Sequence, residues 1–156
     1  MEKYIVSGCL AGLRCRYDGL QKGDELVSKL IEAGIAIPLC PEQLGGLPTP
    51  REGCECMLID GEMRAITKTG KDCTEQYRRG AEMILEFAKK YNIKKAILQK
   101  NSPSCGIRAY DGTFTRTLGD YSGITAKLLM DNGIEVISIE DLTEEDVNLI
   151  LETNNV

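Results

Sequence analysis

Cysteine is the residue type in this chain with the clearest potential for chemistry. The sequence contains seven cysteines and no histidine. The lack of histidine excludes Ser-His-Asp and Cys-His catalysis, histidine facial triads and mixed Cys/His zinc sites. Thiolates remain available for binding a metal or a metal cluster and for redox reactions. The seven residues are Cys9, Cys15, Cys40, Cys54, Cys56, Cys73 and Cys105.

The spacing of the cysteines limits the kind of metal site that they could form. No Cys-x-x-Cys pair is present, so the usual zinc knuckle is missing. The close run of cysteines found in ferredoxins is missing too, and Cys54-x-Cys56 matches neither pattern. A site would therefore have to be assembled from cysteines far apart in the sequence. Any one cysteine, taken alone, could equally be a small buried hydrophobic residue.

Hydrophobic periodicity predicts the elements that would bring such residues together. Short apolar runs indicate strands at 4–9, 35–40, 94–100 and 134–139. Amphipathic patterns indicate helices at 23–34, 74–92, 122–133 and 142–154. This alternation favours a three-layer α/β fold, with a mostly parallel sheet of about four strands and helices on both faces. Because no linker or repeat interrupts the pattern, we expect residues 1–156 to form a single domain.

Local signals add detail to this outline. Residues 56–67 are expected to form a small hairpin with its turn at Asp60-Gly61. Residues 41–53 are rich in proline and glycine and are expected to form a loop. Thr74 and Thr143 each precede a helical pattern, and we expect both to act as N-caps.

Three of the cysteines follow predicted strands. Cys9 ends the first strand, Cys40 ends the second, and Cys105 lies in the loop after the third. Parallel α/β sheets bind ligands beyond the carboxyl ends of their strands, so we expect these thiols at one edge of the sheet. Three thiolates from separate loops could hold a [4Fe–4S] cluster by three irons and leave the fourth iron open. An open iron is a Lewis acid, as an open zinc position is.

Polar residues beside two of these cysteines add a second kind of chemistry. Glu42 follows Cys40 by two residues, and Ser102 and Ser104 precede Cys105. The same residues are common at helix starts, where acids occupy the first turn and serine before proline acts as a cap. A carboxylate and a hydroxyl at one edge with three thiols nevertheless favour a functional site.

Basic residues also gather in the loops that carry the cysteines. Arg14 and Arg51 lie within the cysteine-bearing loops themselves, and the full set is Arg14, Arg16, Lys22, Arg51, Lys100 and Arg108. A cluster held by three thiolates carries negative charge, which nearby cations would stabilise. Charged residues are also common in surface loops without any such role.

Composition and charge limit the classes of partner. Apolar residues make up 42% of the chain and charged residues 28%, as in ordinary soluble domains. The net charge of −5 argues against binding of a nucleic acid polymer. No apolar run reaches membrane-spanning length and the start does not resemble a signal peptide, so we expect a cytoplasmic protein without membrane contact. In that compartment, many cysteines indicate metal or redox work rather than disulfides.

Five segments together resemble a known family over nearly the whole chain. They are "SGCLAGLRCRYDG" (7–19), "LCPEQLGGLPTPRE" (39–52), "KNSPSCG" (100–106), "YDGTF" (110–114) and "GITAKLLMDNGIEVIS" (123–138). The family is that of thiouracil desulfidase, a bacterial and archaeal family formerly catalogued as a domain of unknown function.

The resemblance implies an α/β domain with an oxygen-labile [4Fe–4S] cluster. It places the cluster ligands at Cys9, Cys40 and Cys105, and catalytic roles at Glu42 and Ser102. The implied reaction converts 2-thiouracil to uracil and hydrosulfide without net redox chemistry. The chain departs from the family pattern at Gly8 and Ala11, where alanine and leucine are usual, and at Cys54 and Cys56, where cysteine is unusual.

Two other functions compete with a desulfidase. The same thiols could carry sulfur or a metal between partners, or sense oxidation without catalysis. Such a carrier needs neither Glu42 nor Ser102, so their substitution would leave it working. A nucleotide-binding module is disfavoured, because the glycine-containing stretches match neither GxGxxG nor a P-loop. The sequence identifies neither the thiocarbonyl substrate found in the cell nor the oligomeric state, and it assigns no role to Cys15, Cys54, Cys56 or Cys73.

Overall fold

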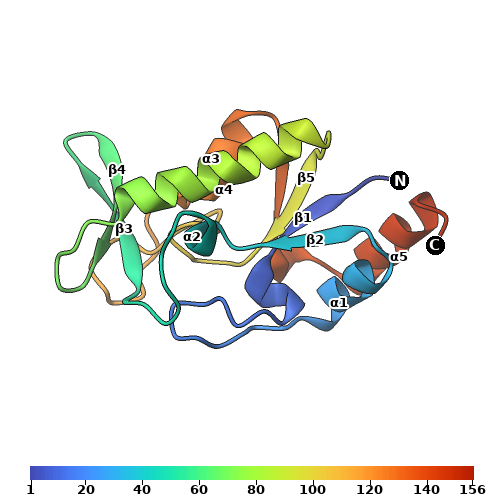
Figure 1. Cartoon of the computed structure of the whole chain (residues 1–156), viewed down its shortest axis with the longest axis horizontal. Coiled ribbons are helices and arrows are strands. Elements are labelled where there is room, and N and C mark those ends of the chain that lie inside the picture. Colours follow the sequence, from blue (N-terminus) through green and yellow to red (C-terminus); the bar gives the residue numbers. More distant parts are fainter.

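The computed structural model describes residues 1–156 and contains a four-stranded parallel sheet at its centre (Figure 1). The strands lie in the order β2-β1-β5-β6, so β2 is an edge strand. They are β1 (Tyr4–Ser7), β2 (Ala36–Leu39), β5 (Lys95–Leu98) and β6 (Glu135–Ser138). All three pairings are parallel. The predicted strands are therefore present, each a few residues shorter than its apolar run.

Helices cover both faces of this sheet, as predicted. One face carries α1 (Glu25–Glu32) and α5 (Glu144–Thr153), and the other carries α3 (Thr74–Lys90) and α4 (Ile124–Asp131) (Figure 1). Three shorter elements complete the fold, namely α2 (Pro41–Leu44) and the 3₁₀ helices η1 (Gly8–Ala11) and η2 (Ile139–Asp141). No helix is both long enough and apolar enough to span a membrane.

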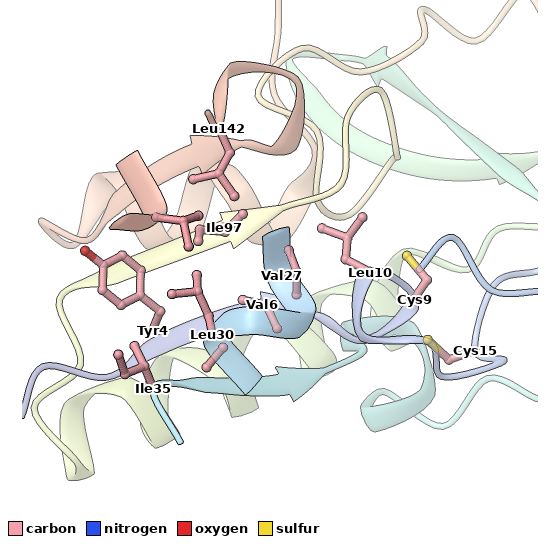
Figure 2. Packing of buried hydrophobic residues seen from close by; sticks show 12 residues of the cluster. Tyr4, Val6, Cys9, Leu10, Cys15, Val27, Leu30, Ile35, Ile97 and Leu142 are labelled. Atoms are coloured by element: carbon pink, nitrogen blue, oxygen red, sulfur yellow. The ribbon is translucent and has the colours of Figure 1, made fainter. Parts of the chain in front are cut away.

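Alternating side chains of the strands fill two separate cores. On β1, Tyr4 and Val6 pack under α1 and α5, whereas Ile5 packs under α3 and α4. Figure 2 shows that the first of these cores extends past the strands to Cys9 and Cys15. The edge where the strands end is thus built on a packed core, which holds these two thiols in place.

A two-stranded antiparallel hairpin lies beside the sheet. It consists of β3 (Cys54–Ile59) and β4 (Glu62–Thr67). Its turn is at Asp60 and Gly61, as predicted, and both residues have positive φ angles of 51° and 77°. The hairpin begins two residues earlier than its sequence pattern suggested, so Cys54 and Cys56 lie within a strand and are buried.

Two helix starts differ from the sequence-based expectations. Thr74 is the first residue of α3 and not its cap, because its Oγ1 accepts a hydrogen bond from Ala65 N at 2.9 Å. The predicted loop 41–53 contains the short helix α2 at its beginning. The expectation for Thr143 is confirmed, since it caps α5 in a capping box with Asp146.

Candidate active site

The sheet topology brings Cys9, Cys40 and Cys105 to one edge. The chain passes from β1 to β2 on one side of the sheet and from β5 to β6 on the other. The strand order therefore reverses between β1 and β5, which is where α/β sheets bind ligands. Cys9 follows β1 in η1, Cys40 follows β2 directly, and Cys105 lies in the turn after β5.

The three thiols also influence one another. Burial raises the pKa of Cys9, Arg16 opposes the shift, and Cys40 adds to it. Burial raises the pKa of Cys105 to about 12, and both Cys9 and Cys40 contribute to that rise. Electrostatic effects of this kind require the sulfur atoms to lie near one another. The structure thus brings together the three residues that the sequence selected as cluster ligands.

The chemistry of these thiols suits an iron–sulfur cluster. Cysteine thiolates are the ligands that hold such clusters, each bound to a different iron. All seven cysteines are free, so no disulfide occupies these thiols. The donor set therefore fits a [4Fe–4S] cluster with three protein ligands.

Polar side chains around the sulfur atoms supply hydrogen-bond donors that the sequence analysis missed. The Ser7 hydroxyl lowers the pKa of Cys105 and the Gln99 side chain lowers that of Cys9, each by a hydrogen bond against the larger effect of burial. Ser7 Oγ also accepts from Gln99 N at 2.9 Å, which joins the ends of β1 and β5. Donors of this kind stabilise thiolates and cluster sulfur. The sequence did contain a signal for the Ser7 donor, because Ser7 is a polar residue at the end of the otherwise apolar strand β1.

A fourth thiol, that of Cys15, lies beside Cys40. A hydrogen bond from the Cys15 thiol lowers the pKa of Cys40 to about 7, despite the opposing effect of burial. The same hydrogen bond, together with burial, raises the pKa of Cys15. As a neutral thiol, Cys40 donates to the Cys15 carbonyl oxygen at 3.7 Å. Cys15 is buried, whereas Cys40 is the one cysteine that is partly exposed.

Glu42 lies in the first turn of α2, and each of its carboxylate oxygens accepts a hydrogen bond. Its Oε1 accepts a hydrogen bond from Arg51 Nε at 3.0 Å, and its Oε2 accepts one from Ser104 Oγ at 2.7 Å. The Arg51 and Glu42 side chains are only 6% and 12% exposed, so this ion pair is largely shielded from water. Burial lowers the pKa of Arg51, but the Glu42 carboxylate outweighs it and the net shift is upward. Arg51 also donates to the Cys15 carbonyl oxygen at 2.9 Å.

Ser102 organises the turn that carries Cys105. Its Oγ accepts hydrogen bonds from Ser104 N at 3.1 Å and from Cys105 N at 2.9 Å. This is the pattern of a helix cap, but only a turn follows. Ser102 Oγ lies 3.0 Å from Ser104 Oγ, so Ser102 reaches Glu42 through Ser104 and not directly.

The whole chain is similar to known proteins. Residues 4–141 match the family model described as 2-thiouracil desulfurase. The chain belongs to this family. It is 41% identical over 147 residues to the uncharacterized protein YbbK of Bacillus subtilis strain 168, an alignment that covers 90% of this chain and 97% of YbbK.

A solved structure supports the same assignment. It is that of a [4Fe–4S]-dependent thiouracil desulfidase, TudS, with a TM-score of 0.85 and 40% sequence identity, covering 98% of this chain and 99% of that one. The predicted family, fold class and enzyme class are thereby confirmed, and the name of this neighbour supports the predicted cluster. A thiol carrier without catalysis is not favoured.

The basic residues that the sequence places in the cysteine-bearing loops do not all reach the thiols and Glu42. Arg14 is exposed, and it is Arg16 whose charge reaches Cys9. Arg51 does lie at the site, where it binds Glu42. The packing of each loop sets the direction of its arginine side chains, and the sequence pattern gives no information about that packing.

The remaining cysteines support the hairpin beside the candidate site. Cys54 and Cys73 are buried in a small core with Ala65 and Tyr77. The Cys56 thiol donates a hydrogen bond to the Pro103 carbonyl oxygen at 3.3 Å, which ties β3 to the turn that carries Cys105. These three residues therefore act in packing, as the simpler interpretation of a single cysteine predicts.

Proposed function

We propose that this chain is a [4Fe–4S]-dependent desulfidase in which Cys9, Cys40 and Cys105 hold the cluster. Glu42 and Ser102 are the catalytic residues, and residues 1–156 act as one domain. One observation carries the proposal: three mutually close thiols and the hydrogen-bonded Glu42 lie together where the strand order reverses. A carrier would have no need of the buried carboxylate at this edge.

The reaction replaces a thiocarbonyl sulfur by oxygen. For 2-thiouracil, a C–S bond breaks, a C–O bond forms, one water is consumed, and uracil and hydrosulfide leave without net transfer of electrons. When bound, the cluster supplies an iron without a protein ligand, which is a Lewis acid suited to soft thiocarbonyl sulfur.

The protein groups handle the proton and the orientation of the reactants. Glu42 acts as the general base that removes a proton from the attacking water. Arg51 fixes one oxygen of that carboxylate through its hydrogen bond at 3.0 Å and leaves the other directed toward the turn that carries Cys105. Ser102 orients the attacking water when its hydroxyl proton turns from Ser104 Oγ to that water, and the same hydrogen bond stabilises the negative charge that develops on the oxygen.

The partner of this site is a small thiocarbonyl molecule, and the reaction takes place in the cytoplasm. The net charge of −5 speaks against a nucleic acid polymer as a partner. Seven free cysteines, four of them at one edge, suit a reducing compartment, where thiols are kept from forming disulfides.

Anaerobic reconstitution with iron and sulfide tests the proposal. We expect four irons and four sulfides per chain, the broad visible absorption of a cubane, and formation of uracil and sulfide from 2-thiouracil. Serine variants of Cys9, Cys40 or Cys105 should lose the cluster, whereas Cys73→Ser, the matched control outside the edge, should keep it. Glu42→Gln should keep the cluster and lose roughly 10²–10⁴-fold in kcat.

Two results would overturn the assignment. Wild-type protein that forms no stable cluster under these conditions would return the thiol carrier or redox sensor to first place. Full turnover by Glu42→Gln with an intact cluster would remove Glu42 from the role of general base.

A further inference from the structure

The hydroxyl of Ser104 lies between the two proposed catalytic residues. Ser104 Oγ is 2.7 Å from Glu42 Oε2 and 3.0 Å from Ser102 Oγ. Ser104 is 2% exposed, so water does not compete for these contacts. Glu42 in α2 and Ser102 in the turn that carries Cys105 lie 60 residues apart in the sequence, and this single hydroxyl connects them.

The number of donors and acceptors on each hydroxyl fixes the direction of this chain of hydrogen bonds. A serine hydroxyl has one proton to donate and two lone pairs that accept. Ser104 uses its proton on the Glu42 carboxylate, so at the contact between the two serines Ser102 must be the donor. The acceptor sites of Ser102 are taken by the amides of Ser104 and Cys105. The Ser102 hydroxyl therefore donates to Ser104 Oγ, and the Ser104 hydroxyl in turn donates to Glu42.

A second acceptor is within reach of Ser104 but competes poorly. Cys105 Sγ lies 3.7 Å from Ser104 Oγ, compared with 2.7 Å for the carboxylate oxygen of Glu42. A short hydrogen bond to an ionised carboxylate is stronger than a long one to sulfur. The Ser104 hydroxyl therefore donates to the Glu42 carboxylate in preference to the Cys105 sulfur.

The backbone around Ser104 is rigid enough to hold the hydroxyl in place. Its carbonyl oxygen accepts hydrogen bonds from Thr125 N at 2.9 Å and Ala126 N at 3.0 Å, at the start of α4. Gly123 packs against the same peptide, since a Cβ there would lie 2.7 Å from the carbonyl carbon of Ser104. A helix and a close glycine contact therefore fix the position from which Ser104 reaches Glu42.

We propose that Ser104 is a positioning residue for the desulfidase reaction. Its hydroxyl fixes the free oxygen of the Glu42 carboxylate and sets the direction of the Ser102 proton, while Arg51 holds the other carboxylate oxygen. This inference rests on the proposed function, because it assumes that Glu42 and Ser102 are catalytic. It assigns a specific role to a serine that the sequence marked only as a polar neighbour of Cys105.

The test compares Ser104→Ala with Ser104→Thr, which keeps the hydroxyl. Ser138→Ala is the matched control, because Ser138 is also a buried serine at the same edge and donates to a carboxylate, that of Glu140, at 3.2 Å. Three quantities are measured on each protein: iron and sulfide per chain, kcat and KM for 2-thiouracil, and the Glu42 side-chain conformation in a crystal structure of the cluster-free protein.

We expect Ser104→Ala to keep its full iron content while kcat falls about 10–100-fold, because the catalytic groups lose their alignment. KM should stay within about twofold of wild type, as expected when ground-state binding is untouched. Glu42 Oε2 should leave its position in the crystal structure, and Ser104→Thr should restore both that position and most of kcat. Ser138→Ala should change none of these quantities.

Several outcomes would overturn the proposal. An unchanged kcat or an unmoved Glu42 in Ser104→Ala would show that the hydroxyl is dispensable, and loss of iron would make it a support of the cluster instead. If Ser104→Ala does not fold, kcat is compared between Ser104→Thr and Ser104→Val, which differ mainly in the hydroxyl. Equal kcat values in these two variants would refute the proposal. A wild-type protein without desulfidase activity would refute the proposed function, whereas the Glu42 conformation would still test Ser104.

Discussion

Gly80 on α3 packs directly against the backbone of Pro41 at the start of α2. A Cβ at Gly80 would overlap the Pro41 carbonyl oxygen, and a Cβ at Gly45 would overlap the backbone of α3. The two glycines let α2 and α3 approach closely, which brings Glu42 near the Tyr77 hydroxyl. Burial raises the pKa of Tyr77, and the Glu42 carboxylate raises it further. The position of Glu42 at the site thus depends on a contact between two glycine-containing helices.

Gly80→Ala should therefore damage both stability and activity. Overlap with backbone cannot be relieved by a side-chain rotation, so we expect a loss of about 1–3 kcal/mol in the free energy of unfolding. Turnover per cluster should fall as well, because α2 carries Glu42. Urea denaturation and a desulfidase assay measure the two effects. Gly23→Ala is the matched control, since the one close contact of a Cβ there would be with the flexible end of Gln21, at 2.7 Å, and the nearest backbone atom would be at an ordinary 3.8 Å.

The ion pair between Arg51 and Glu42 gives a second prediction. Arg51→Met leaves a buried carboxylate without its partner, which should cost about 3 kcal/mol of unfolding free energy. The double variant with Glu42→Gln should recover part of this loss, because no unpaired charge remains. Denaturant unfolding of the cluster-free protein provides the measurement.

An exposed ion pair serves as the control for this prediction. Lys127 and Asp131 lie 2.9 Å apart with side chains 61% and 56% exposed. Lys127→Met should therefore cost less than about 0.5 kcal/mol. Equal losses in the Arg51 and Lys127 variants would contradict the importance assigned to burial of the Arg51–Glu42 pair.

The main features of the fold and the gathering of three thiols at one edge could be predicted from local patterns. Apolar runs followed by Cys9, Cys40 and Cys105 were sufficient, because parallel strands present their carboxyl ends at one edge. The hairpin turn at Asp60-Gly61 and the cap at Thr143 were likewise found, since each depends on residues only a few positions apart.

The contacts that complete the site could not be predicted in this way. Ser104 meets Glu42 across 62 residues of sequence, and Arg51 meets the Cys15 carbonyl across 36. Thr74 was expected to cap α3, but it bonds to Ala65 on a neighbouring strand instead. In each case a tertiary contact decides what a polar side chain does, and periodicity carries no information about that contact.

The thiols of the cluster-free protein should differ in their reactivity toward iodoacetamide. Cys40 has a pKa lowered to about 7 and is partly exposed, so its thiolate dominates above that pH and its alkylation rate should rise through pH 7 and then level off. Cys105 and Cys56 have pKa values raised to about 12 by burial, so both should stay unmodified at pH 8. Mass spectrometry after timed alkylation identifies the modified residue.

The cause of the Cys40 shift can be tested in the same experiment. Cys15→Ala removes the hydrogen bond that lowers the pKa of Cys40, so the midpoint of its alkylation should move upward toward the ordinary cysteine value of about 8.5. Cys73→Ala should leave that midpoint in place. Preferred alkylation of Cys105, or a midpoint unaffected by Cys15→Ala, would contradict the arrangement described for this edge.

Glu55 on β3 anchors the loop between the Cys105 turn and α4. Its Oε1 accepts hydrogen bonds from Gly112 N and Phe114 N, each at 3.0 Å, and the residue is buried. Phe114 has a φ angle of 58°, which residues other than glycine rarely adopt, whereas the φ of 92° at Gly112 suits glycine. Hydrogen bonds to a charged acceptor contribute about 1.5–3 kcal/mol, enough to account for such a loop being ordered.

Glu55→Ala should therefore release this loop without unfolding the sheet. We expect the amides of Gly112 and Phe114 to exchange with deuterium faster by at least about tenfold, the factor that corresponds to 1.4 kcal/mol, while amides of β1 and β5 keep their protection. Glu52→Ala is the matched control, because Glu52 binds Thr69 at the exposed side of the hairpin and not this loop. Unchanged exchange at Gly112 and Phe114 in Glu55→Ala would mean that other contacts, such as the Tyr121 hydroxyl on the Cys56 carbonyl oxygen at 2.8 Å, hold the loop by themselves.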